Sequence, residues 1–142
     1  MSVRVYVPAT SGLLGVLQAE GRLPGPVRAH AVTDELRAAW PEADEESLEY
    51  AAMMAAAATS AGLRGAEDRP RRYVVAADVP EVSAVPGEDP SLVDVAADVV
   101  LKRVAAIHAD TADRTDLDGP DGDEEPDDDL AWFATQELPY LP

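Results

Sequence analysis

The acidic residues of this chain are concentrated toward its end, and this limits how much of the sequence can form a packed domain. Residues 110–142 contain 12 acidic residues and a single basic one, Arg114, whereas residues 1–109 contain 16 acidic and 10 basic residues. Residues 110–129 also have almost no apolar side chains, so they cannot bury enough surface to offset the entropy lost on ordering. We therefore expect a globular domain over residues 1–109, a disordered acidic linker over 110–129 and a separate C-terminal segment over 130–142.

The composition excludes several kinds of site. The 142 residues include no cysteine, which excludes disulfides, thiolate metal sites and a cysteine nucleophile. With only two histidines, we expect no metal site and no cofactor. The formal net charge of −17 disfavours direct nucleic acid binding, because that affinity comes from basic groups at phosphates. We find no signal-peptide pattern and no apolar run long enough for a membrane span, so we expect a cytoplasmic protein without membrane contact.

The first part of the chain predicts a strand, a helix and a second strand. Residues 3–7 alternate apolar and polar side chains, and we expect Pro8 to stop the strand because it has no N–H to donate. Thr10 or Ser11 can cap the helix that follows, and Gly21 is placed to end it. Residues 27–31 again alternate. A strand, a helix and a strand in this order predict a crossover with two parallel strands.

The rest of the domain predicts two helices and several further strands. Thr33 and Asp44 can each begin a helix, and the second is alanine-rich until Gly62 and Gly65. The apolar run 73–79 predicts a central strand buried on both faces, residues 82–85 an edge strand, 92–100 extended structure and 104–108 the last strand. The expected fold is α/β or α+β, with a single-layer mixed sheet of four or five strands, beginning β-α-β and packed with about three helices.

Five short stretches carry a resemblance to a known family. They are R-V-Y-V-P-A-T at 4–10, D-E-E-S-L-E-Y-A-A at 44–52, R-Y-V-V-A-A-D-V-P at 72–80, R-V-A-A-I-H at 103–108 and W-F-A-T-Q-E-L-P at 132–139. Together they resemble a family of small actinobacterial proteins of unknown function. The resemblance implies a bacterial cytoplasmic protein with a single small α/β-type domain, and it supplies no catalytic residues.

The C-terminal segment is the strongest candidate for a docking element. After the acidic stretch, residues 130–141 contain three of the seven aromatic residues of the chain. Asp129 can cap a short helix from Leu130 to about Gln136. The candidate docking residues are Leu130, Trp132, Phe133, Leu138 and Tyr140. The segment either binds a groove on a partner, as amphipathic helices do, or folds back over its own sheet, and we favour folding back because exposed sheet edges usually need a cover.

The turn between the first strand and the first helix is a weaker candidate for a ligand site. Thr10, Ser11 and Gly12 combine two hydroxyls with free N–H groups at a helix start, which can bind a phosphate or carboxylate. The turn matches neither a P-loop nor a dinucleotide-binding motif. Ordinary helix capping is therefore the favoured interpretation.

Two other groups of residues admit both structural and functional interpretations. His30 and His108 lie on predicted strands and could be neighbours, but a general base or a metal pair would need a carboxylate such as Asp78 or Asp110 nearby. Structural histidines are favoured. Residues 69, 71 and 72 form an arginine cluster that could bind phosphate or receive the acidic linker, although such clusters are usually solvated loops.

The residues therefore favour a non-enzymatic function. We expect a small cytoplasmic interaction or regulatory protein whose C-terminal aromatic segment docks on its own domain or on a protein partner. The acidic linker could also imitate a nucleic acid backbone, although a spacer is the commoner role of such stretches. The alternative is a small-ligand binding protein or an enzyme that uses the first turn. The sequence shows no concentrated set of serine, histidine and acidic residues, which argues against an enzyme, although folding can bring distant residues together.

Overall fold

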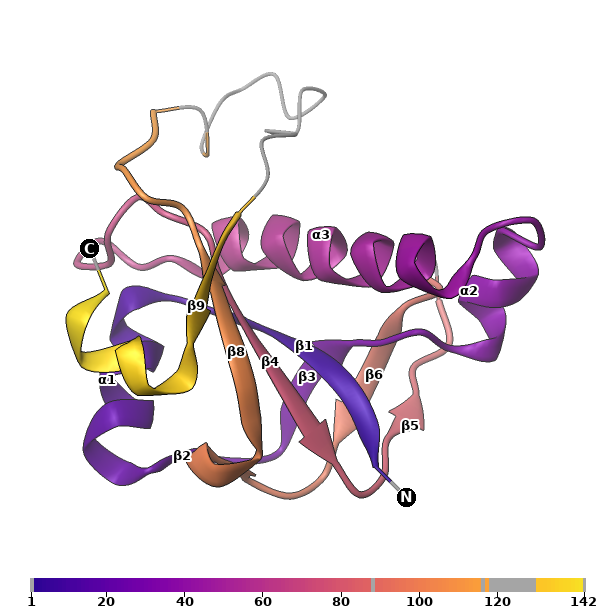
Figure 1. The fold of residues 1–142 in the computed structure, drawn as a ribbon, viewed down its shortest axis with the longest axis horizontal. Coiled ribbons are helices and arrows are strands. Elements are labelled where there is room, and N and C mark those ends of the chain that lie inside the picture. Colours follow the sequence, from indigo (N-terminus) through magenta and orange to yellow (C-terminus); the bar gives the residue numbers. More distant parts are fainter. Residues whose placement is uncertain (1, 88, 116, 118–129, 142) are drawn as a thin grey trace.

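A computed structural model describes residues 2–87, 89–115, 117 and 130–141 (Figure 1). Its elements in chain order are β1 (Val3–Ala9), α1 (Ser11–Glu20), β2 (Arg22–Leu23), β3 (Val27–His30), α2 (Asp34–Ala39), α3 (Glu45–Leu63), β4 (Tyr73–Val79), β5 (Ser83–Ala84), β6 (Leu92–Val95), β7 (Val99–Val100), the 3₁₀-helix η1 (Leu101–Arg103), β8 (Val104–Ala109), β9 (Ala131–Ala134) and the 3₁₀-helix η2 (Thr135–Tyr140). Seven strands form one sheet in the order β5-β6-β3-β1-β4-β8-β9, and β2 pairs with β7 in a second, two-stranded sheet.

The strand directions correct the predicted topology. All strand pairs of the described residues are antiparallel, and β1 pairs with β3 at Tyr6 and His30. The predicted parallel β-α-β crossover and mixed sheet are therefore wrong, and the sheet has seven strands instead of four or five. The physical reason is the path after α1. Gly21 adopts a left-handed conformation with a φ of 72°, and β2 then runs beside β7, so the chain returns antiparallel to β1.

Proline in the first strand interrupts only one of its two ladders. Contrary to the prediction, β1 continues through Pro8 to Ala9, and Pro8 lies opposite Val74 of β4. With β3, in contrast, β1 shares only the pair Tyr6 and His30. Alternate residues of a strand direct their N–H groups to opposite edges, so one missing N–H can end pairing on one side and leave the other intact.

Both faces of the sheet are covered. α3 lies along one face, where Leu48, Ala52 and Ala56 pack against Tyr6 and Val74 (Figure 1). These buried positions recur every four residues, so one stripe of α3, with alanine at two of these three positions, faces the sheet. The other face carries α1 and η2. Its core includes Val5, Val7, Leu14, Leu17, Val75, Ile107 and Leu138.

Several local predictions are confirmed. β4 is the predicted central strand, and its residues are almost all buried. β5 lies at one edge of the sheet as predicted. The structure also corrects the prediction that β8 is the last strand, because β9 follows it. The predicted disorder of the linker concerns residues that lie mostly outside the described ones, namely 116 and 118–129.

Candidate functional site

The C-terminal segment forms the second edge of the main sheet. β9 pairs antiparallel with β8, from Ala131 opposite Ala109 to Ala134 opposite Ala106, and η2 follows directly. The predicted helix from Leu130 to Gln136 is therefore wrong. In so short a segment the apolar residues fit either period, and the ladder with β8 decides in favour of the strand. Leu130 accordingly packs into the core under α3, whereas Phe133 packs against the core on the opposite face.

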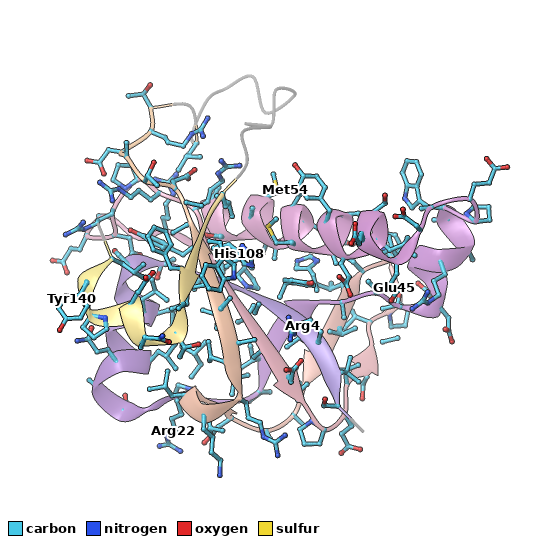
Figure 2. The ribbon with its side chains drawn as sticks, in the orientation of Figure 1. Arg4, Arg22, Glu45, Met54, His108 and Tyr140 are labelled. Atoms are coloured by element: carbon cyan, nitrogen blue, oxygen red, sulfur yellow. The ribbon has the colours of Figure 1, made fainter. Side chains whose placement is uncertain are left out.

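The five candidate docking residues separate into two groups. Leu130 and Leu138 are 9% and 6% exposed and belong to the two cores, and Phe133 is partly buried. Trp132 and Tyr140, in contrast, are 62% and 83% exposed. Figure 2 shows Tyr140 at the periphery of the molecule, pointing away from the sheet. The segment thus covers its own sheet with some side chains and presents two aromatic rings to solvent.

The outer edge of β9 has backbone groups directed away from β8. The Ala134 N–H donates to Oε2 of Glu137 at 3.3 Å, so it does not take part in the ladder with β8. Alternate residues of a strand face the same edge, which means that the N–H and C=O of Trp132 also point outward. Within the described part of the chain, no strand pairs with this edge. Trp132 therefore combines an exposed ring with outward backbone donor and acceptor groups.

The turn before α1 is occupied by a carboxylate of the chain itself. Thr10 caps α1 by accepting a hydrogen bond from the Leu13 N–H at 3.2 Å, as predicted for ordinary capping. Oδ1 of Asp68 accepts from the Gly12 N–H at 2.9 Å and from the Ser11 hydroxyl at 3.3 Å, while Oδ2 accepts from the Gly65 N–H at 2.7 Å. The Gly65 and Gly12 amides lower the pKa of Asp68. The anion-binding capacity of the turn is thus satisfied internally, by a residue that the sequence did not single out.

The two histidines are not neighbours. β1 and β4 lie between β3, which carries His30, and β8, which carries His108. Neither candidate carboxylate is an ion-pair partner of a histidine among the described residues. Asp78 pairs with Arg4 at 2.7 Å, and Asp110 pairs with Arg72.

His30 instead belongs to a buried hydroxyl network that sequence reasoning missed. Its Nδ1 lies 2.8 Å from Oγ of Ser91 and its Nε2 lies 3.0 Å from Oγ1 of Thr59. Ser91 also donates to Asp89 at 2.7 Å. Serine, histidine and aspartate meet here, but Ser91 and His30 are only 2% and 1% exposed. The network ties β3 to α3 and to the loop before β6. Only the spatial contacts reveal it, because His30, Thr59 and the pair Asp89 and Ser91 come from three distant parts of the sequence.

The arginine cluster receives the first acidic residues after β8. Arg72 is buried, and it donates to Asp110 through Nη2 at 2.8 Å, through Nε at 3.0 Å and through its backbone N–H at 2.7 Å. Arg71 donates to Asp113 at 2.8 Å. Burial alone would raise the pKa of Asp110, but the hydrogen bonds and charge of Arg72 lower it overall. The sequence left two roles open for the cluster, phosphate binding and contact with the acidic linker. The structure shows that Arg71 and Arg72 contact the first acidic residues of that linker.

Comparison with known proteins gives one match. The sequence model of DUF6912, described as a family of unknown function, matches residues 3–141. The chain belongs to this family. The resemblance to an uncharacterised family, based on five stretches, is thereby confirmed. No curated protein and no solved structure matches the chain.

The described residues of this DUF6912 chain hold neither a cluster suited to a metal ion nor a membrane-spanning helix. They include no group of three or more histidine, cysteine or acidic residues that could hold a metal ion. None of the described helices has the length and apolar character needed to cross a membrane. The most distinctive solvent-facing feature is the β9 edge, by which we mean the outward backbone of residues 131–134 together with the ring of Trp132.

Proposed function

We propose that this DUF6912 chain is a non-enzymatic interaction protein that binds an extended segment of another protein along the β9 edge. The observation that carries the proposal is the exposure of Trp132, at 62%, on the last strand of a seven-stranded sheet. An extended peptide can add a strand to such an edge, with backbone hydrogen bonds giving affinity and side-chain contacts giving specificity.

The cost of exposing a tryptophan supports a binding role. An indole buries about 150–250 Å² when it is covered, and tryptophan is among the residues that most often dominate binding energy at interfaces. The fold does not need this ring for cover, because Leu130 and Leu138 already fill the two cores from the same segment. A partner that covers Trp132 therefore gains apolar contact that the free protein lacks.

Charge favours a basic partner over a second copy of the chain. The formal net charge is −17, and the stretch from Asp121 to Asp129 that precedes β9 in the sequence contains seven acidic residues. Two copies that paired through β9 would bring like charges together, which is unfavourable. A segment with lysine or arginine beside an apolar β-strand pattern is attracted instead, and its association should weaken as salt rises.

The proposal can be tested by selecting peptides from a displayed library against the full chain. We expect enrichment of extended segments that combine basic and apolar residues. Their affinity should fall at least tenfold in Trp132→Ala, which corresponds to about 1.4 kcal/mol. Trp40→Ala is the matched control, because Trp40 is equally exposed, at 61%, but lies at the end of α2.

Two outcomes would overturn this function. One is equal loss of affinity in the Trp132 and Trp40 variants, which would indicate nonspecific contact with exposed indoles. The other is self-association of the wild-type chain that Trp132→Ala abolishes, measured by sedimentation, which would make β9 a contact between copies.

A further inference from the structure

A cleft between α1 and η2 brings together both regions that the sequence singled out. It has a volume of about 200 Å³, and its wall includes Ser11 from the first turn and Leu138 from the C-terminal segment. Figure 1 shows η2 beside α1, on the face of the sheet opposite α3. This cleft is separate from the β9 edge and from the buried His30 network. Its size suits a small ligand, since pockets for drug-sized molecules begin at about 300 Å³.

One side of the cleft is apolar and open. Leu14 of α1 and Leu138 and Leu141 of the C-terminal segment line it. Gly15 also lines it, and a Cβ atom added at Gly15 would meet no atom within 4 Å. The absence of a side chain on this turn of α1 therefore leaves space that a short apolar group can fill.

The other side of the cleft carries Arg69, whose guanidinium has no ion-pair partner among the described residues. Arg69 lines the cleft, and its backbone N–H donates to Oγ of Ser11 at 2.9 Å. In the described part of the chain, its guanidinium forms no ion pair, whereas Arg71 pairs with Asp113 and Arg72 with Asp110. Arg69 is thus held at the rim of the cleft by its backbone while its charged group is available to a ligand.

A second donor beside the cleft also lacks an acceptor. Nη1 of Arg71 is buried and has no hydrogen-bond partner among the described residues. Burial raises the pKa of Tyr73, and the positive charges of Arg71 and Arg69 oppose that rise. Tyr73 itself lines the cleft. A buried donor without an acceptor is costly. Arg71 itself does not line the cleft, so Arg69 is the arginine that faces a ligand there.

We infer that the α1–η2 cleft binds a small organic carboxylate. The carboxylate pairs with the Arg69 guanidinium, and the short apolar chain of the ligand lies between Leu14, Leu138 and Leu141 over Gly15. An arginine fork matches the two oxygens of a carboxylate, and such charge-assisted hydrogen bonds are stronger than neutral ones. The carboxylate of Asp68 does not fill this position, because it is directed into the turn, where the Gly12 and Gly65 amides hold it.

The test is a titration of the isotope-labelled full chain with isovalerate, followed through the backbone amide resonances. We expect saturable shifts at Ser11, Gly15 and Gln18, which lie along the cleft. Isovaleramide, which has the same shape without the charge, should bind the wild type at least tenfold more weakly than isovalerate does. Isovalerate should likewise bind Arg69→Gln at least tenfold more weakly than it binds the wild type. Arg103→Gln is the matched control and should leave binding unchanged. Arg103 is also an exposed arginine, but it directly precedes β8 and does not line the cleft.

A second variant separates the two parts of the inference. Gly15→Leu keeps every charge but fills the apolar side of the cleft, so it should also weaken isovalerate binding at least tenfold. The inference is overturned if isovalerate causes no localised shifts. It is also overturned if isovaleramide binds the wild type, or isovalerate binds Arg69→Gln, as tightly as isovalerate binds the wild type. Trp132→Ala should leave the titration unchanged, so failure of the proposed peptide interaction and failure of this site are distinguishable.

Discussion

The C-terminal segment has side chains in two opposite environments, the core and the solvent, within one short stretch. Leu130 and Leu138 are buried in the two cores, whereas Trp132 and Tyr140 lie in solvent. The inward residues make the segment an integral edge of the sheet. The outward residues lie mostly in solvent, and the proposed partner would contact them. Stability and binding should therefore depend on different residues of the same segment, and the following variants test that separation.

The largest effect on stability is expected where the chain leaves β8 toward this segment. Asp110→Ala removes the carboxylate that accepts three hydrogen bonds from Arg72, whose guanidinium is buried. Breaking a buried pair in this way costs about 3–5 kcal/mol. Chemical denaturation should show this loss. A loss below about 1 kcal/mol would mean that water or another group already solvates Arg72.

Truncation of an inward residue should have the next largest effect. Leu138→Ala removes a nearly buried side chain from the core between η2 and the sheet, and such changes cost about 2–5 kcal/mol. The same denaturation measurement applies, with Leu13→Ala as the control because Leu13 is 37% exposed on α1. Equal losses in the two variants would show that the segment is not anchored through Leu138.

The pH dependence of stability gives a smaller effect next to the segment. His108 lies opposite Trp132, and burial and the positive charge of Arg4 lower its pKa. Burial likewise lowers the pKa of His30. The unfolded chain then binds protons at a pH where the folded chain does not, so the free energy of unfolding should fall as pH decreases through about 6.5.

The same measurement in His108→Gln checks the origin of this slope. The glutamine does not titrate, so the loss of stability between neutral and mildly acidic pH should be smaller than in the wild type. An unchanged slope would assign the effect to other groups and would indicate that the edge beside Trp132 does not exclude water from His108.

The smallest effect on stability is expected for the outward residue. Trp132→Ala should change the free energy of unfolding by no more than about 0.5 kcal/mol, because the side chain is mostly in solvent. Thermal unfolding followed by circular dichroism is sufficient for this comparison. A loss close to that of Leu138→Ala would contradict the division between inward and outward residues.

Local features of the fold could be predicted from the sequence. Thr10, Thr33 and Asp44 cap α1, α2 and α3 as expected, because a side-chain oxygen before a helix satisfies a free N–H within three residues. Gly21 ends α1 in the expected left-handed conformation. The continuous apolar run of β4 likewise predicts burial on both faces. Each of these depends on neighbours in the sequence.

Features that depend on distant contacts could not be predicted in the same way. The direction of β3 relative to β1 follows from the excursion through β2 and its pairing with β7, more than seventy residues away. The carboxylate that fills the first turn comes from Asp68, and the partners of His30 come from α3 and the loop before β6. The helix predicted at residues 130–136 failed because the β8 ladder outweighs local preference.

Amide hydrogen exchange along β9 tests the central claim most directly. The hydrogen bond from the Ala134 N–H to Glu137 places the N–H groups of Ala131 and Phe133 toward β8 and that of Trp132 outward. In the free chain we expect slow exchange at Ala131 and Phe133 and fast exchange at Trp132, and saturation with a selected basic peptide should slow exchange at Trp132. A Trp132 amide that is protected in the free chain, or that gains no protection with bound peptide, would contradict the account.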